Sequence, residues 1–166
     1  AAGHSGGTMQ NGLLYHDEKL HEVPRSGIVH RLDKDTTGLL VVARNLKSHN
    51  SLVDQLQNRS MHREYQAIVF GVLTAGNTID KPMGRHGRDR KKMAVKPEGK
   101  EAITHFRVLD RYRGHSRIKV NLETGRTHQI RVHMAYVRHP LVGDQTYAGR
   151  LQIPAGASDE LKEMLR

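Results

Sequence analysis

The sequence predicts an α+β fold in which a mixed, mostly antiparallel sheet is flanked by helices. Strand patterns outnumber helical patterns, and several of the strands are expected to pair as hairpins. The chain has 166 residues, enough for one domain with a buried core. No internal repeat is visible, so we expect a single domain over residues 1–166.

The first third of the chain predicts two helices separated by a polar loop and a strand. A short helix is expected over residues 11–16. The polar run GIVHRLDKDTTG (27–38) leads directly into the apolar run LLVVA (39–43), which is typical of a strand buried on both faces. The polar run is therefore expected to be a loop anchored to the core. Ser48 is expected to cap the second helix, whose apolar face carries Leu52, Val53 and Leu56.

The middle of the chain predicts three strands. Residues 63–72 alternate between two faces, and Tyr65 lies near the start of this strand. A tyrosine in a strand is most often structural, and spacing alone gives Tyr65 no other role. Residues 104–109 and 116–123 are expected to form a hairpin. In its second arm the residues that face the core are Ile118, Val120 and Leu122.

A helix is expected to follow, capped by Thr127 and ended by Pro140. Its buried side carries Ile130, Met134 and Val137. Arg126 lies at the expected helix start, where free N–H groups favour anions, and the spacing places His128 and Arg131 on one helix face. These cations predict an anion site, although an ordinary amphipathic helix with a basic face explains the spacing equally well.

The charge of the chain favours a polyanionic partner. Lys and Arg number 27 against 17 Asp and Glu, which gives a formal net charge of +10. Cations that displace counterions from phosphates supply affinity for nucleic acid of any sequence. The run RHGRDRKK (85–92) is expected to be a solvated basic loop suited to hold an RNA backbone. A soluble protein with a merely basic surface is the alternative.

Several classes of protein are excluded or disfavoured by what the sequence lacks. Without cysteine there is no disulfide, thiolate nucleophile or cysteine-ligated zinc. His128 and His133 would lie roughly 140° apart around a helix, so no metal site is expected. Neither GxxxxGK[ST] nor GxGxxG occurs, which disfavours a nucleotide cofactor. No membrane-spanning run or signal peptide is visible, so we expect a cytoplasmic protein with no membrane partner.

The polar run around Asp33 is the strongest candidate for chemistry. Arg31 lies two residues from Asp33, and a nearby guanidinium favours an ionised carboxylate. Asp35 offers a second carboxylate, but two groups on one short loop do not easily flank opposite faces of a sugar, as glycoside hydrolysis requires. One carboxylate that acts with an arginine is the simpler design.

Three segments together resemble the RluA family of pseudouridine synthases, and within it the group that modifies large-subunit ribosomal RNA. They are GIVHRLDKDTTGLLVVAR (27–44), REYQA (63–67) and LETGRTHQIRVHMA (122–135). The resemblance continues through HPLVGD (139–144) and runs over nearly the whole chain in the family's order. It implies the pseudouridine synthase catalytic fold and the isomerisation of specific uridines in 23S ribosomal RNA, without cofactor or metal.

The resemblance also implies roles for individual residues. The catalytic carboxylate would be Asp33, and the arginine that pairs with it would be Arg131. Tyr65 would stack on the flipped uracil and be placed to take part in proton removal. The residues implied in RNA contact are Arg31, Arg126 and His128.

Family members extend beyond both ends of this chain, so we expect a catalytic domain that is truncated at each end. A monomer is expected. Three alternatives stay open: a relative that acts on tRNA or another ribosomal RNA site, an RNA N-glycosidase that releases free uracil, and a non-catalytic RNA-binding module. Mapping the modified RNA distinguishes the first, and the product formed on RNA distinguishes the other two.

Overall fold

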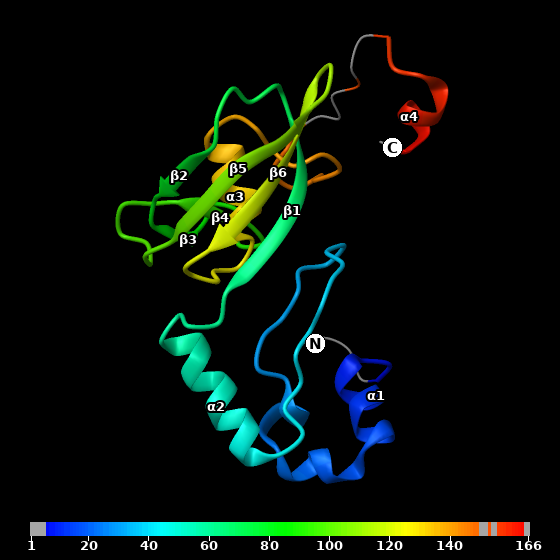
Figure 1. Cartoon of the computed structure of the whole chain (residues 1–166), viewed down its shortest axis with the longest axis vertical. Coiled ribbons are helices and arrows are strands. Elements are labelled where there is room, and N and C mark those ends of the chain that lie inside the picture. The colour runs from blue at the N-terminus through cyan, green and yellow to red at the C-terminus, as the bar shows by residue number, and fades with distance from the viewer. Residues whose placement is uncertain (1–5, 150–152, 154–155, 165–166) are drawn as a thin grey trace. The chain divides into compact units, whose positions relative to one another are not determined.

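A computed structural model describes residues 6–149, 153 and 156–164 of the chain. The chain divides into two compact units, Ala1–Met61 and His62–Arg166, and each is described by itself (Figure 1). The expectation of a single catalytic domain over residues 1–166 stays a prediction.

The first unit consists of short helices joined by loops. They are the α-helices α1 (Met9–His16) and α2 (Leu46–Gln57) and the 3-10 helices η1 (Glu18–Glu22) and η2 (Pro24–Gly27). The predicted helix over 11–16 is confirmed as the C-terminal part of α1. The cap of α2 is Asn45 rather than Ser48. The Asn45 side chain accepts from the backbone N–H of Ser48 at 2.8 Å, so Ser48 closes a capping box from inside the helix.

The second unit is built on an antiparallel sheet of four strands in the order β1-β6-β5-β2. Its strands are β1 (Arg63–Phe70), β2 (Asn77–Asp80), β5 (Ile103–Arg111) and β6 (His115–Leu122). Strands β3 (Met83–Arg85) and β4 (Met93–Val95) form a separate antiparallel pair. Helices α3 (Gln129–Tyr136) and α4 (Asp159–Met164) follow the strands. The predicted α+β class is confirmed.

The predicted hairpin is confirmed as β5 and β6. Val120 of β6 pairs with Phe106 of β5 on one side and with Tyr65 of β1 on the other. Ile118 and Val120 are fully buried, because side chains that alternate along a strand place every second residue on the same face.

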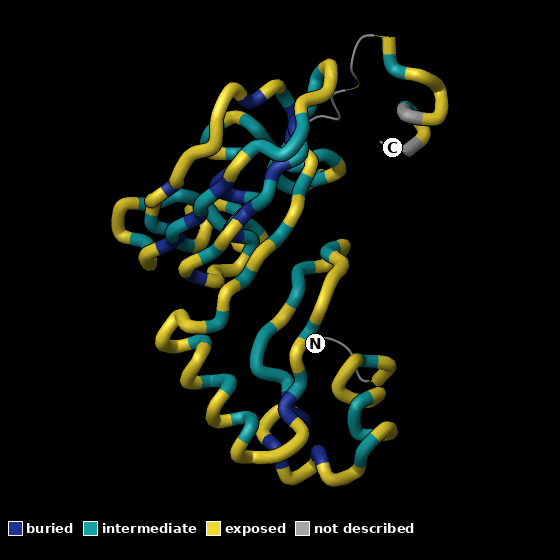
Figure 2. Tube along the Cα trace, in the orientation of Figure 1, coloured by how far each residue is buried: buried dark blue, intermediate teal, exposed yellow. Residues whose placement is uncertain are grey.

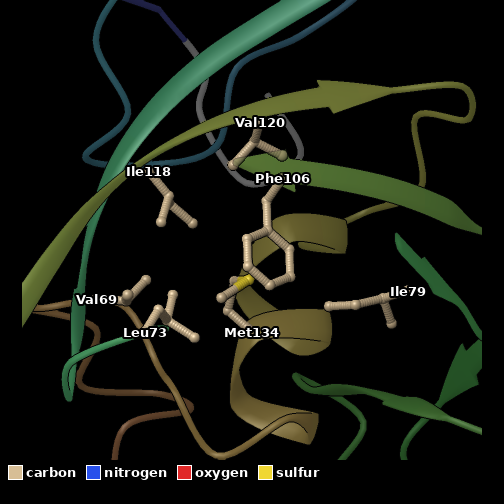
Figure 3. Close-up of a cluster of buried hydrophobic side chains, with 7 residues drawn as sticks. All are labelled: Val69, Leu73, Ile79, Phe106, Ile118, Val120 and Met134. Carbon is tan, nitrogen blue, oxygen red and sulfur yellow. The ribbon is translucent and has the colours of Figure 1, made fainter. Parts of the chain in front are cut away.

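Helix α3 covers the buried face of this sheet. Met134 of α3 is fully buried, and the predicted core positions Ile130 and Val137 pack against the same cluster. Figure 3 shows Met134 beneath the ring of Phe106. The buried members of the cluster are Val69, Leu73, Ile79, Phe106, Ile118, Val120 and Met134.

The apolar run 39–43 is not the predicted strand with two buried faces. Leu39 is 93% exposed and Val41 is 42% exposed, and only Ala43 is buried. Figure 2 shows that the long loop before α2 consists mostly of exposed and intermediate residues. Within the described residues, the run makes one isolated antiparallel bridge, between Val42 and Ile28. A strand is buried on both faces only when neighbouring strands and covering layers surround it, and a single bridge supplies neither.

Candidate functional site

Asp33 lies on a loop whose two ends are held together. The backbone N–H of Ala43 donates to the carbonyl of Gly27 at 2.9 Å, and that of Val41 donates to Nε2 of His30 at 3.0 Å. Gly27 has a φ of +80°, and a Cβ added there would lie 2.0 Å from the Ala43 carbonyl oxygen. Only glycine fits this close approach, so Gly27 allows the two ends of the loop to meet at its base.

The tip of the loop turns at Asp33, as the polar run predicts. The backbone N–H of Thr36 donates to the Asp33 carbonyl at 3.1 Å, and Asp35 adopts a left-handed φ of 66°. Asp33 is half-buried, whereas Arg31 and Asp35 are exposed. The two carboxylates therefore have different environments, and the less accessible one is the predicted catalytic residue.

The segment before α3 departs from the predicted cap. Thr127 is exposed, and the residue that precedes the helix is His128, with a left-handed φ of 57° and no side-chain cap. His128 therefore lies outside α3, and the prediction that it shares a helix face with Arg131 is wrong. No side chain of the described residues caps the helix; the Gln129 side chain instead holds the segment before it, because its carbonyl oxygen accepts from the Arg126 backbone N–H at 3.0 Å.

Gln129 belongs to a buried polar network that ties this segment to β5. Its carbonyl oxygen accepts from the Thr124 hydroxyl at 2.7 Å, and its amide donates to the Ile103 carbonyl at 2.9 Å and to the Thr104 hydroxyl at 3.0 Å. A buried network of this kind is stabilising when its members are satisfied, and it fixes one arrangement of the chain. It positions the turn that carries Arg126 and His128.

His133 completes the network from the next turn of α3. Its ring is fully buried; Nε2 donates to the Lys81 carbonyl at 2.9 Å, and Nδ1 accepts from the Thr104 hydroxyl at 2.8 Å. Burial lowers the pKa of His133, against the opposing effects of the Lys81 carbonyl and the charge of Asp80. The folded protein therefore holds a neutral imidazole in this position.

We expect His133 to make the stability of the protein depend on pH. The unfolded chain protonates this histidine near its ordinary pKa of 6.5, but the folded chain does so only at a lower pH. The free energy of unfolding should therefore fall as the pH is lowered from about 7 to 5. His133→Gln should flatten this fall in urea titrations, and the matched change at the exposed His62 should not. Parallel curves for His133→Gln and wild type would contradict this.

Arg131 makes a two-pronged ion pair with Asp144. Nε lies 2.7 Å from Oδ2 and the second guanidinium nitrogen 2.9 Å from Oδ1, and the two side chains are 19% and 4% exposed. Burial raises the pKa of Asp144, but the hydrogen bonds from Arg131 and from the Thr146 and Tyr147 backbone outweigh it, so this pKa lies below its usual value. The sequence reasoning missed Asp144. Its only signal was the position of Asp144 at the end of the HPLVGD segment.

The remaining predicted residues occupy distinct settings. Tyr65 is half-buried on β1 and packs against the core cluster of the sheet. Arg126 is exposed, and its Nε donates to the Glu101 carbonyl at 3.0 Å. Nδ1 of His128 lies 2.8 Å from the Tyr147 hydroxyl.

The structure brings three of the predicted residues together at the start of α3: Arg126, His128 and Arg131. Asp33 and Arg31 belong to the first unit. The pairing of Asp33 with Arg131 stays a prediction.

The basic loop (residues 85–92) connects β3 to β4. Most of its cationic side chains are exposed, as predicted: Arg85, Arg88, Arg90 and Lys91. The loop is closed by a hydrogen bond from the His86 N–H to the Lys92 carbonyl at 3.0 Å. It therefore presents closely spaced positive charges on a short, tied turn.

In the part of the chain that the structure describes, no cluster of three or more histidine and acidic side chains has the arrangement of a metal site. None of the helices described is long and apolar enough to cross a bilayer.

The chain matches the model of the RNA pseudouridylate synthase family over residues 4–136. It is 60% identical over its whole length to ribosomal large subunit pseudouridine synthase D of Pseudomonas aeruginosa, of which it covers 52%. It is 58% identical over 165 residues to the synthase D of Vibrio cholerae, of which it covers 51%. The chain thus spans about half the length of these curated relatives.

A solved structure supports the same relationship. Human RNA pseudouridylate synthase domain containing 1 superposes with a TM-score of 0.71 at 26% identity, over 95% of this chain and 63% of the human chain. The match to the family model, over residues 4–136, includes both the loop around Asp33 and the start of α3. The chain belongs to the RNA pseudouridylate synthase family.

Proposed function

We propose that the protein isomerises uridines to pseudouridine in large-subunit ribosomal RNA, with Asp33 as the catalytic carboxylate and without a cofactor. The observation that carries this proposal is the similarity of the entire chain to synthases named for the large ribosomal subunit, at 58–60% identity for the two relatives above. The loop of Asp33 supports it, because a half-buried carboxylate on a loop held at both ends is suited to react in a defined geometry.

The reaction needs no oxidant or reductant. The bond between uracil N1 and ribose C1′ breaks, the base turns, and a bond forms between C5 and C1′. C5 loses its hydrogen as a proton, and N1 gains a proton. The nucleotide must first leave its stack to expose the base to the enzyme. Asp33 would act on this nucleotide, Tyr65 would stack on its base and share in proton removal, and Arg131 would pair with the carboxylate.

RNA would be held by the cations of both units. Arg31 would contact RNA near the flipped nucleotide, and Arg126 and His128 would contact it at the start of α3. The basic loop would bind the backbone through charge. Its exposed arginines and lysine are suited to this role, since phosphate contacts position an RNA without reading its sequence.

We expect the loss of charge in the basic loop to weaken RNA binding and to reduce its dependence on salt. In the variant Arg88→Gln, Arg90→Gln, Lys91→Gln, the slope of log affinity against log salt should fall by about 2–3, because each phosphate contact contributes about 0.7–0.9. Filter binding from about 50 to 200 mM salt measures this slope. A variant that neutralises three exposed cations elsewhere, Lys47, Arg107 and Arg113, is the matched control. Equal slopes for the two variants would argue against the loop.

The proposed substrate is tested by supplying unmodified transcripts of large-subunit ribosomal RNA and of tRNA to the purified protein in its full natural length. Pseudouridine is then mapped at nucleotide resolution. We expect modification at a few positions of the ribosomal transcript and little on tRNA. Preferential modification of tRNA would overturn the assignment of substrate, and RNA binding without any modification would favour a non-catalytic module.

A further inference from the structure

We infer that Tyr147 is a positioning residue that holds the basic loop and the cations at the start of α3 in one fixed arrangement. The inference rests on the proposed function, since it concerns how bound RNA is aligned with the reacting groups. The juxtaposition that carries it is the Tyr147 hydroxyl, which bonds to Met93 and to His128, together with the Tyr147 ring, which lies against Arg131.

The hydroxyl of Tyr147 connects two segments that are distant in the sequence. The backbone N–H of Met93 donates to it at 2.9 Å, and Nδ1 of His128 lies 2.8 Å from it. Met93 is the first residue of β4 and directly follows Lys92, the last residue of the basic loop. One oxygen atom therefore ties the end of the basic loop to the residue that precedes α3.

The ring of Tyr147 contacts Arg131 and His128. The guanidinium carbon of Arg131 lies 4.9 Å from the ring centroid, and the His128 ring meets it edge-on with centroids 5.6 Å apart. A guanidinium over an aromatic face is attracted to it. The phenol thus orients Arg131 through its face and His128 through its hydroxyl and its ring.

Tyr147 is itself held in place. Its backbone N–H donates to Oδ1 of Asp144 at 3.1 Å, and this same carboxylate takes the two hydrogen bonds from Arg131. The side chain packs, partly buried, against the second core cluster, which includes Met83 and Val132. Tyr147 and Arg131 are therefore fixed to each other through one carboxylate and cannot shift independently.

This arrangement gives the hydroxyl a role beyond stability. RNA gripped by the basic loop would be placed relative to His128 and Arg131 through the bond from Met93. A displacement of about 1 Å in the reacting groups can cost about 100-fold in rate. Loss of the hydroxyl should therefore impair turnover much more than RNA affinity.

Tyr147→Phe isolates the hydroxyl, because it keeps the ring beneath Arg131. We expect kcat to fall by about 10- to 100-fold, while the Kd for RNA changes by less than about threefold and the melting temperature stays near that of wild type. Tyr112→Phe is the matched control, since Tyr112 is an exposed tyrosine near the β5–β6 turn. A kcat within about twofold of wild type would overturn the inference, as would a lower kcat that merely follows a loss of folded protein.

A double-mutant cycle tests the coupling to the basic loop. In the background of the loop variant Arg88→Gln, Arg90→Gln, Lys91→Gln, we expect the effect of Tyr147→Phe on kcat/KM to shrink at least threefold, because RNA is then no longer aligned through the loop. A merely structural role for Tyr147 predicts additive effects. Strict additivity would thus remove the proposed link.

Hydrogen exchange gives a reading that does not depend on activity. Tyr147→Phe should reduce protection of the Met93 amide. RNA binding should slow exchange both in residues 86–93 and near His128 in wild type, but only in residues 86–93 in the variant. If wild type binds RNA without turnover, the proposed function is wrong. The exchange pattern still tests the inference in that case, because it needs only RNA binding. Unchanged protection of Met93 in the variant would contradict the inference alone.

Discussion

Arg131→Ala is expected to lower the free energy of unfolding by about 3 kcal/mol and to remove most of the turnover. Asp144 is 4% exposed, and without Arg131 its negative charge is left buried with only part of its compensation. Breaking a buried ion pair by removing one partner costs about 3–5 kcal/mol, and the partial exposure of Arg131 places this pair near the lower end. Urea denaturation at pH 7 measures the loss of stability.

An exposed ion pair supplies the matched control. Arg117 pairs with Asp110 on the sheet, and both side chains are about 40% exposed. Arg117→Ala should cost less than about 1 kcal/mol, as is usual for exposed pairs. If Arg131→Ala and Arg117→Ala destabilise the protein equally, Asp144 does not depend on Arg131 in the way the geometry indicates.

The pH dependence of the same pair provides a second reading. Because the pKa of Asp144 in the folded protein is below its ordinary value of 3.8, its contribution to stability is fully present above that value. The contribution is lost as the pH falls through the lowered pKa. Arg131→Ala should therefore lower the free energy of unfolding at neutral pH and reduce its further fall in acid.

Asp33→Asn is expected to reduce turnover on RNA by about 10³-fold or more while leaving RNA affinity within a few-fold of wild type. An amide keeps the shape of the side chain but supplies neither a negative charge nor a base, so it removes the group on which the proposed chemistry depends. Single-turnover rates at saturating protein separate this loss from any change in binding.

Asp35 is the matched control for Asp33. It lies two residues away on the same loop, is exposed, and has the same side chain. Asp35→Asn should change the single-turnover rate by only a few-fold. Equal losses for the two variants would show that the charge of the loop, rather than one carboxylate, supports the reaction.

Regular elements could be predicted from the sequence where a simple period governs them. The β5–β6 hairpin and the buried positions Ile118, Val120 and Met134 follow from alternation and from helical spacing. The prediction of a strand buried on both faces at 39–43 was wrong, because an apolar composition indicates burial but does not supply the neighbouring strands that bury it. The predicted caps were wrong because Asn45 caps α2 in place of Ser48, and α3 follows His128, which is left-handed and offers no side-chain cap.

The candidate site could be predicted in its segments but not in its contacts. The polar loop around Asp33 and the cations Arg126, His128 and Arg131 stand out as residue types in short runs. Asp144 and Tyr147 do not, because they reach Arg131 and His128 only after the chain has turned past Pro140. Pairings between segments depend on tertiary packing, which no local pattern records.

The most direct test of the central claim is a product balance on unmodified large-subunit RNA labelled with tritium at uracil C5. For wild type we expect each tritium released to be matched by one pseudouridine in the RNA, with no free uracil, and for Asp33→Asn we expect neither product. Free uracil that still carries the tritium would reveal a glycosidase. Pseudouridine formed by Asp33→Asn at the wild-type rate would contradict the catalytic role of this carboxylate.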